Sequence, residues 1–372
     1  MKIAINCSHY FPQAGGVKEY IFNLLHNIAT INNEIEIIIY VSKDYYQFAI
    51  DTLPHNYFIK QTPFTSKSSI FRSLNENKYY QREEEVEKFD IFHSPFFHAP
   101  KLKKAKLLMT IHDMRIYRYP LTFSLLRYIF CYFKVKSSVR RSDKIISISH
   151  FTKEEIVKLC KIKSNKISVV HEAINRDFFS PLTVENYQPT INPNIISGDF
   201  ILSVGHLEPR KNFNSLIKAF NDIENKNIKL IIAGKKNHGY RETLKLINQN
   251  KNIYYLEFVD SKLLVWLYKY AKLFVFPSFY EGFGFPPLEA AALGTVSAVS
   301  NVSSMPEICG ESVIYFDPFD IGSMTQTINN ALINDELIAS KKELLKSRLD
   351  KFSWQKNAEE TLKLYNEMMT NK

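Results

Sequence analysis

The chain has 372 residues, a formal net charge of +10 and 45% hydrophobic residues. That length exceeds a typical single domain and favours two domains, with enough apolar residues to bury sizeable cores. The positive charge favours anionic partners such as nucleotide sugars, lipid phosphates or an anionic membrane. No recognisable nucleic-acid-binding module accompanies it, so no nucleic-acid partner is expected.

Cysteine usage and the apolar stretches bear on the cellular compartment. Four scattered thiols without the spacing of a zinc site suit a reducing cytosol. They are Cys7, Cys131, Cys160 and Cys309. The first residues are typical of a short strand and not of a signal peptide, and the most apolar stretch, Leu121 to Phe133, is interrupted by Arg127 and is too short to span a bilayer. We therefore expect a cytoplasmic protein, free or peripheral on the inner face of the cytoplasmic membrane.

The chain opens with the pattern of a nucleotide-binding fold. Lys2–Cys7 predicts a buried strand, residues 17–28 carry apolar side chains at helical spacing, and Glu34–Val41 predicts a second strand. Together they form the first βαβ unit of a doubly wound domain. Gly15 and Gly16 precede the helix, where they either let the backbone approach a phosphate or the acceptor, or only form a turn.

Further strands are predicted in the rest of the first half, at 90–95, 107–111, 143–149 and 166–170. His112 lies at the carboxyl end of one of them, where doubly wound folds bind ligands, although a structural role also fits a single histidine. His112 is therefore a candidate site residue.

Thr152 and Glu155 have the spacing of a capping box for the next helix.

The segment 120–141 is both apolar and basic. Its apolar stripe consists of Leu125, Leu126, Ile129, Phe130 and Phe133, and its positive charge comes from Arg127, Lys134, Lys136, Arg140 and Arg141. Such a helix either covers the sheet or lies on an anionic membrane. The two roles are compatible if they use different faces of the helix.

A second α/β unit follows a linker. Residues 181–197 contain three prolines and no apolar periodicity, which is typical of a linker. The later strands are predicted at 200–204, 229–233, 253–259, 273–276, 296–299 and 313–316, and a last helix runs from Ser353 to Met369. Arg210 and Lys211 follow the first of these strands, where two adjacent cations either clamp a diphosphate or are simply solvated.

The stretch after the strand 273–276 has the features of a ligand loop. The loop contains Gly282, Phe283 and Gly284, and two prolines then begin a helix that stops at Gly294. A helix N-terminus favours a phosphate, and glycines let the backbone approach a ligand closely. The stretch therefore predicts a phosphate-binding loop.

Two glutamates accompany this loop. Glu281 lies on the loop, and Glu289, eight positions later, lies inside the helix. Their carboxylates can accept hydrogen bonds from sugar or ribose hydroxyls, so the stretch predicts a pocket for a sugar joined to a nucleotide diphosphate. The alternative is a buried or solvated glutamate pair around an ordinary strand, loop and helix.

The glutamate pair resembles the Glu-x7-Glu motif of retaining glycosyltransferases of the GT-B type, and the chain is most similar to family 4 of these enzymes, also called group 1. The string SFYEGFGFPPLEA resembles the bacterial O-antigen and polysaccharide mannosyltransferase branch. The resemblance implies an α/β fold of the GT-B class, with two Rossmann-like doubly wound domains facing each other across a cleft. It implies an acceptor domain at 1–180, a linker at 181–197, a donor domain at 198–350 and a C-terminal helix at 351–372 that crosses back to the first domain.

The resemblance also implies roles for the candidate residues. His112 would bond a hydroxyl of the transferred sugar, and Glu281 with the backbone of residues 282–284 would hold that sugar. Glu289 would bind the ribose hydroxyls. His112 and Glu281 are thus expected to be catalytic through positioning and electrostatics, without a firmly established protein nucleophile.

The phosphates would be bound by a second group of residues. Gly15 and Gly16 would face the donor diphosphate, which Arg210 and Lys211 would clamp. Many relatives have arginine at the position of His206, so the contribution of His206 stays open. The sequence has no Asp-x-Asp motif, so we expect no metal and no cofactor, with cations and a helix terminus stabilising the leaving group.

The expected activity is transfer of a hexose from a nucleotide diphosphate sugar, with mannose from GDP-mannose as the best guess. The acceptor would be a hydroxyl of a lipid-linked or polysaccharide glycan in surface polysaccharide or O-antigen synthesis, and the anomeric configuration would be retained. The alternatives are a UDP-sugar-dependent transferase of the same fold, a sugar-nucleotide epimerase or phosphorylase, and a membrane-associated scaffold without enzymatic activity. The sequence fixes neither donor, linkage nor oligomeric state.

Overall fold

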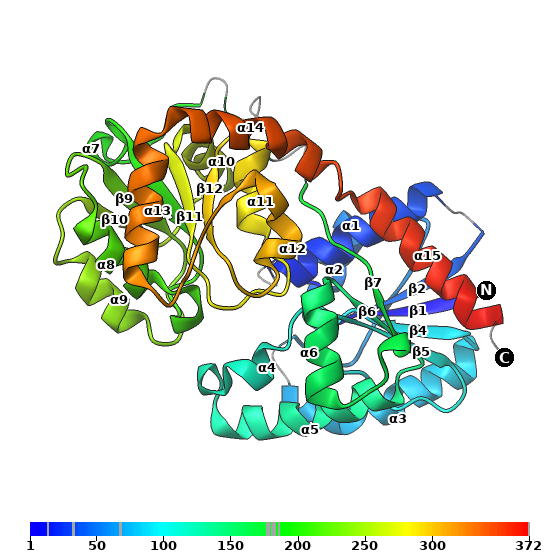
Figure 1. The fold of residues 1–372 in the computed structure, drawn as a ribbon. Coiled ribbons are helices and arrows are strands. Elements are labelled where there is room, and N and C mark those ends of the chain that lie inside the picture. The colour runs from blue at the N-terminus through cyan, green and yellow to red at the C-terminus, as the bar shows by residue number, and fades with distance from the viewer. Residues whose placement is uncertain are drawn as a thin grey trace. The chain divides into compact units, whose positions relative to one another are not determined.

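The computed structural model describes residues 1–12, 15–31, 34–66, 69–175, 179, 184 and 187–370, with the backbone alone for 69–74 and 193. The chain divides into two compact units (Figure 1). The first unit consists of Met1–Ala173 and Ser353–Lys372, and the second of Ile174–Phe352.

The first unit contains a seven-stranded sheet of order β3-β2-β1-β4-β5-β6-β7, in which every neighbouring pair is parallel. The strands are β1 (Lys2–Cys7), β2 (Glu36–Val41), β3 (Phe58–Gln61), β4 (Ile91–Ser94), β5 (Lys106–Ile111), β6 (Lys144–Ser147) and β7 (Ile167–Val169). Both faces of the central strands are buried, as their nearly continuous apolar sequences predict. The strand order reverses between β1 and β4, and ligands of such sheets bind at the carboxyl ends near this point.

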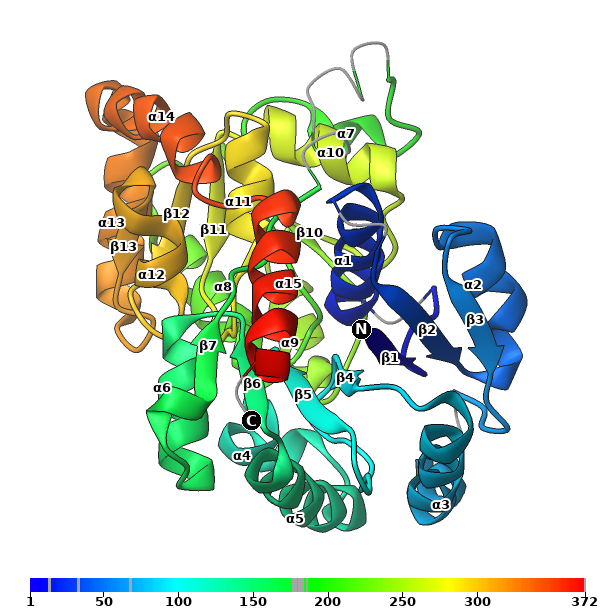
Figure 2. The ribbon, with the colours of Figure 1, turned by 90° about the vertical axis from the view of Figure 1, so that its right-hand side faces the viewer.

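Helices cover the sheet of the first unit. They are α1 (Gly16–Ile31), α2 (Tyr46–Thr52), α3 (Ser69–Glu87), α4 (Arg115–Arg118), α5 (Leu125–Arg141), α6 (His150–Cys160) and α15 (Trp354–Thr370). One core joins α3, α5 and α6 to alternate strand residues through Tyr80, Val139 and Ile156. The C-terminal helix α15 packs against α1, so the two ends of the sequence meet in one unit (Figure 2).

The second unit contains a six-stranded parallel sheet of order β10-β9-β8-β11-β12-β13. The strands are β8 (Phe200–Val204), β9 (Lys229–Ala233), β10 (Ile253–Leu256), β11 (Leu273–Phe276), β12 (Ser297–Ser300) and β13 (Ile314–Phe316). Here the order reverses between β8 and β11. The loops that follow these two neighbouring strands carry the candidate donor residues, at the edge where a ligand is expected.

The helices of the second unit form two layers on this sheet. They are α7 (Pro193–Ile196), α8 (Phe213–Asp222), α9 (Tyr240–Ile247), α10 (Ser261–Tyr270), α11 (Phe285–Ala292), α12 (Met305–Cys309), α13 (Ile321–Ile333) and α14 (Asp335–Leu349). Alternate residues of β8 point to opposite layers: Ile201 packs with α8, α9 and α13, whereas Phe200 and Leu202 pack with α10, α11 and α12.

The segment 181–197, for which the sequence predicts a linker, is described except for residues 181–183 and 185–186. Val184 is buried in the core of the second unit, against which Tyr187 and Ile195 also pack. One sequence expectation differs from the structure. The capping box predicted at Thr152 and Glu155 is wrong, because α6 begins earlier.

The actual cap of α6 is Ser149, whose side chain accepts a hydrogen bond from the Thr152 N–H at 3.1 Å. Glu155 turns to Arg118 of α4 and forms a bidentate ion pair with it. Ser149 and Thr152 are both residue types that cap helices, so local preference alone did not decide between them.

Candidate active site

The loop after β8 places two cations at the carboxyl edge of the second sheet. It forms a short 3-10 helix, Pro209–Lys211, which begins with proline after Glu208 and ends at Asn212 in a left-handed conformation (φ 58°). The Asn212 side chain donates to the Pro318 carbonyl at 3.0 Å, which fixes the end of the turn. The loop is therefore held rigidly on both sides of Arg210 and Lys211.

Arg210 is buried and bound by acceptors from two loops. Its guanidinium donates to Oε1 of Glu208 at 3.0 and 2.7 Å and to the Tyr280 carbonyl at 2.5 Å, and its Nη1 lies 2.8 Å from Oε2 of Glu281. The second carboxylate oxygen of Glu208 accepts a hydrogen bond from Asn237 at 2.9 Å. The planar guanidinium thus links the loops that follow β8 and β11.

Lys211 pairs with the other oxygen of the same glutamate. Its Nζ lies 2.7 Å from Oε1 of Glu281 and 5.0 Å from the centre of the Phe276 ring. Arg210 and Lys211 therefore each form an ion pair with one oxygen of the Glu281 carboxylate. Two cations and two carboxylates meet here, so the predicted diphosphate clamp carries its own counter-charges.

Burial and pairing shift the pKa values of these groups in opposite senses. Burial by itself raises the pKa of Glu281, but the charges of Arg210 and Lys211 outweigh it and lower that pKa to about 2. Burial, assisted by the charge of Arg210, lowers the pKa of Lys211. The pKa of His206 is also lowered, by burial and by the neighbouring cations. His206 therefore adds little positive charge to the cluster at neutral pH.

The loop between β11 and α11 is shaped by small residues and serines. Gly284 precedes α11 with φ 107°, and a β-carbon at this position would lie 2.1 Å from Cε of Met305, so a larger residue does not fit. The Ser304 hydroxyl bonds to the carbonyl oxygens of Glu281 and Phe283 at 3.0 and 2.7 Å. The Glu281 N–H donates to the Ser303 hydroxyl at 3.2 Å.

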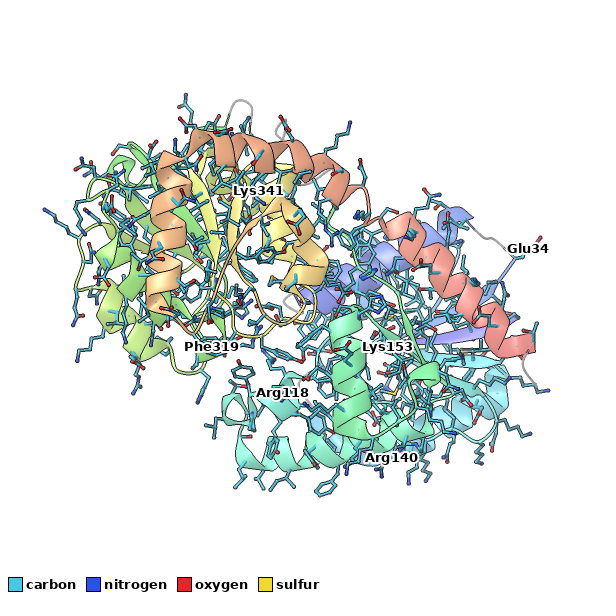
Figure 3. All side chains as sticks on the ribbon, in the orientation of Figure 1. Glu34, Arg118, Arg140, Lys153, Phe319 and Lys341 are labelled. Carbon is cyan, nitrogen blue, oxygen red and sulfur yellow. The ribbon has the colours of Figure 1, made fainter. Side chains whose placement is uncertain are left out.

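The second glutamate of the motif lies on α11 as the sequence predicts. Glu289 accepts a hydrogen bond from the Tyr268 hydroxyl at 2.7 Å. Burial and this carboxylate raise the pKa of Tyr268 well above its ordinary value, so the phenol stays protonated and keeps donating. Beside the Arg210 loop, the exposed Phe319, which is labelled in Figure 3, stacks on Phe279 with ring centres 5.0 Å apart.

In the first unit, His112 follows β5 as predicted and is held by two acceptors. Its Nδ1 lies 2.9 Å from Oε1 of Glu172, and its Nε2 lies 3.4 Å from the Pro95 carbonyl oxygen. The Tyr20 ring stands edge-on to the imidazole at 5.0 Å. Burial lowers the pKa of His112, but Glu172, Asp113 and the Pro95 carbonyl together outweigh burial, and the net shift is upward.

The two glycines of the first loop are exposed at the start of α1. Gly15 has φ 59°, a left-handed conformation that favours glycine, and its carbonyl accepts hydrogen bonds from the N–H groups of Lys18 and Glu19 at 3.0 and 3.2 Å. A turn is thus present, and its role towards a phosphate stays a prediction.

The structure brings together part of the predicted set within each unit. Arg210, Lys211 and Glu281 form one cluster in the second unit, on the loop that continues into Gly282, Phe283 and Gly284. Sequence reasoning missed Glu172, which pairs with His112, and Glu208, which pairs with Arg210. Glu208 lies two positions before Arg210 and could have been suspected, but Glu172 lies 60 positions from its partner.

Among the residues that the structure describes, no group of three or more His, Cys, Asp and Glu side chains is arranged to hold a metal ion. Within the same residues, no helix combines the length and the apolar character needed to cross a bilayer.

The family described as Glycosyltransferase Family 4 matches residues 14–178, and the family described as Glycosyl transferases group 1 matches residues 193–346. Together they account for most of both units. The chain belongs to the group 1, family 4 glycosyltransferases. The family resemblance seen in the sequence is thereby confirmed, and the protein is a glycosyltransferase.

Two relatives of this glycosyltransferase come from Escherichia coli. O-antigen chain mannosyltransferase B is 28% identical over 74% of this chain and 74% of its own length. The serotype-specific mannosyltransferase WbdA is 28% identical over 61% of this chain, which spans only 29% of WbdA.

Solved structures share the fold at low sequence identity. Sucrose-phosphate synthase from Thermosynechococcus elongatus has a TM-score of 0.80 at 18% identity, with both chains covered in full. HepE from Anabaena, solved in complex with UDP and glucose, has a TM-score of 0.74 at 14% identity, covering 99% of this chain and 100% of its own. These likenesses confirm the predicted fold class of two Rossmann-like doubly wound domains.

Proposed function

We propose that the protein is a retaining, metal-independent glycosyltransferase that moves mannose from GDP-mannose to a hydroxyl of a lipid-linked or polysaccharide acceptor. The proposal of mannose rests on the names of its relatives, which are O-antigen chain mannosyltransferases. The observation that supports the donor site is the cluster of Arg210, Lys211 and Glu281 at the carboxyl edge of the second sheet, where the strand order reverses between β8 and β11.

The cluster suits a sugar joined to a diphosphate. Arg210 and Lys211 would bind phosphate oxygens through charge-assisted hydrogen bonds, and the backbone N–H groups of the loop before Pro286 would add to them. Glu281 stays ionised at neutral pH because its pKa is about 2, so it can accept hydrogen bonds from sugar hydroxyls. Glu289 would bind the ribose hydroxyls. No cofactor takes part in this scheme.

Retention follows if the acceptor attacks from the face that the diphosphate leaves. The bond between the anomeric carbon and the diphosphate oxygen breaks, and the acceptor oxygen bonds to that carbon. The acceptor proton passes to a phosphate oxygen of the leaving group. The cations of the cluster would stabilise the negative charge that develops on the diphosphate, a contribution that needs no metal ion.

Calorimetric titration with GDP-mannose, UDP-glucose and ADP-glucose tests the donor. We expect GDP-mannose to bind in the presence of a metal chelator, and Arg210→Ala to weaken binding at least tenfold, because each charge-assisted hydrogen bond contributes about 1.5–3 kcal/mol. The control is Lys236→Ala, which removes an exposed ion pair with Glu257 and should leave binding unchanged.

The outcomes separate the alternatives. Binding of UDP-glucose alone would replace the proposed donor, and donor conversion without an acceptor to an epimer would assign an epimerase. Anomeric proton couplings of the product distinguish retention from inversion. Failure of every nucleotide sugar to bind would refute the proposal as a whole.

We infer that α5 gives the enzyme a peripheral site on an anionic, cytoplasmic membrane surface. The inner face of α5 is buried through Cys131, Val135 and Val139. Its outer face exposes large apolar side chains, and the turn before α5 exposes one more. Each of these side chains is 45–84% accessible. They are Leu121, Leu125, Leu126, Ile129, Phe130 and Phe133. Apolar side chains next to cations favour the interface of an anionic bilayer.

Cations border this outer face. Arg127 and Arg140 are exposed on α5, and Arg140 can be located in Figure 3. Co-sedimentation with anionic and neutral vesicles tests the surface: Leu125→Ser with Phe133→Ser should lose binding to anionic vesicles, whereas Phe258→Ser, which alters an exposed phenylalanine of the second unit, should not. Equal sedimentation of all variants would refute the membrane role of α5.

A further inference from the structure

Both ring nitrogens of His112 face groups that accept hydrogen bonds. Nδ1 lies 2.9 Å from a carboxylate oxygen of Glu172, and Nε2 lies 3.4 Å from the carbonyl oxygen of Pro95, which has no proton to give. A neutral imidazole would leave one nitrogen lone pair against an acceptor. Only the doubly protonated imidazolium can donate on both sides.

Glu172 is placed for this task by the sheet. It follows β7, two strands away from β5, so its side chain reaches past β6 to the histidine. The carboxylate is 1% exposed, whereas the side chain of His112 is 18% exposed. The buried carboxylate fixes the ring of this partly accessible histidine through Nδ1 and leaves Nε2 for a second partner.

The remaining neighbours of His112 come from other elements. Tyr20 of α1 packs edge-on against the ring, Asp113 adjoins it in the sequence, and His93 of β4 lies nearby. Burial lowers the pKa of His93 to about 3, so this second histidine is neutral and adds no charge. Glu172 and Asp113 are the carboxylates that act on His112.

The C-terminal helix holds both sides of this arrangement. Asn357 of α15 donates to the carbonyl of His171, the residue before Glu172, at 2.8 Å. On the other side, the Tyr20 hydroxyl bonds to Thr110 at 3.0 Å, and Thr110 bonds to His93 at 2.8 Å.

His93 in turn bonds through Nδ1 to the Tyr365 hydroxyl of α15 at 2.7 Å. Each end of α15 therefore anchors one partner of the histidine: the Glu172 loop through Asn357, and the Tyr20 ring through this buried chain of hydrogen bonds.

We propose that Glu172 is a positioning residue that keeps His112 as an imidazolium at neutral pH and directs its Nε2–H, as a cationic donor, towards an oxygen of the substrate. The long contact to Pro95, at 3.4 Å, is weak enough for a substrate oxygen to replace it. A cationic donor binds an electron-rich oxygen more strongly than a neutral imidazole does. The catalytic part of this inference rests on the proposed glycosyl transfer, whereas the charge state of His112 does not.

Nuclear magnetic resonance titration of the histidine ring protons tests the charge state without any substrate. The chain has ten histidines, and the loss of one signal in His112→Gln assigns the resonance. We expect His112 of the wild type to titrate above pH 7, and Glu172→Gln to lower its midpoint by about 1–3 pH units, because an opposite charge at this distance shifts a pKa by that amount.

The matched control is Glu155→Gln. Glu155 is also a buried glutamate of the first unit, and it pairs with Arg118 of α4. This variant should leave the midpoint of His112 unchanged. A wild-type midpoint below pH 7, or an equal midpoint in Glu172→Gln, would overturn the inference, and the first of these readings needs no variant to fold.

The pH profile of sugar transfer is the second readout. Activity should fall at high pH as His112 loses its proton, and in Glu172→Gln this fall should move to lower pH by the shift measured by resonance. If the titration behaves as expected but the profile does not move, the charged histidine has no part in the reaction. If no donor is converted, the proposed function fails while the titration still decides the state of His112.

Discussion

Replacing Glu281 by glutamine should destabilise the second unit in a way that depends on pH. The substitution keeps the size of the side chain but removes the charge that Arg210 and Lys211 share at 2.8 and 2.7 Å. Arg210 retains Glu208 and the Tyr280 carbonyl as acceptors. Lys211 loses the carboxylate at its Nζ, so the main cost comes from a buried ammonium group with weaker pairing.

The size of the effect follows from the pKa of Glu281. The structure lowers this pKa from its ordinary 4.5 to about 2. Each pKa unit corresponds to about 1.4 kcal/mol, so the ionised carboxylate contributes about 3 kcal/mol at pH 7. That value agrees with the cost of about 3–5 kcal/mol for removing one partner of a buried ion pair.

The sign of the pH dependence is fixed by the direction of the shift. A carboxyl group with a depressed pKa stabilises the folded state above its unfolded pKa, and this contribution is lost as the pH falls from about 4.5 to about 2. The difference between wild type and Glu281→Gln should therefore shrink from about 3 kcal/mol at pH 7 to about 1 kcal/mol at pH 3.

The two tryptophans allow the second unit to be followed alone. Trp266 lies on α10 in the second unit and Trp354 on α15 in the first, so in a Trp354→Phe background the fluorescence reports the second unit. Urea unfolding at pH 7, 5 and 3 gives the free energies. Glu257→Gln is the control, because its partner Lys236 is exposed and the pair should contribute less than about 1 kcal/mol. A Glu281→Gln penalty that is the same at every pH would refute the reasoning.

Three further predictions use the same unfolding assay in the unit concerned. Gly284→Ala should cost about 1–3 kcal/mol, because its φ is 107° and its β-carbon would overlap Met305, and Gly294→Ala, with positive φ but open space, should cost less. Tyr365→Phe should cost about 1–3 kcal/mol by leaving His93 Nδ1 without its partner, and no loss would mean that this hydrogen bond adds nothing. Because the folded pKa of His93 is about 3, the first unit should lose about 1.4 kcal/mol per pH unit from that group as the pH falls from 6.5 towards 3, and His93→Gln should abolish that part of the slope.

The sequence predicted the donor loop closely because its signals are local. The strand Leu273–Phe276 is a short apolar run and coincides with β11. The two prolines and the preceding glycine mark the start of α11 within a residue, since proline fits a first helical turn and Gly284 supplies a positive φ. Arg210 and Glu281 meet because the neighbouring parallel strands β8 and β11 bring their following loops to one edge of the sheet, an adjacency that the sequence did not predict.

Other features depend on contacts that no short segment encodes. The strand β3 (Phe58–Gln61) was missed, since it has four residues and lies at the edge of its sheet. Glu172 meets His112 only after β5, β6 and β7 have formed their register. The pairing of Arg210 and Lys211 with Glu208 and Glu281 could not be predicted from the sequence either, because side-chain pairing is decided by the tertiary fold.

The terminal helix α15 sets an order for biosynthesis. Its side chains Tyr365 and Asn357 bond to residues of the first unit, whose sheet is translated first. Residues 174–352, which form the second unit, separate that sheet from α15 in the sequence. During synthesis the second unit is continuous in the sequence and can fold as soon as it emerges, whereas the first unit is completed only after α15 (Trp354–Thr370) has followed. A stop codon before residue 354 would therefore leave His93 and the carbonyl of His171 without the hydrogen-bond partners that α15 supplies.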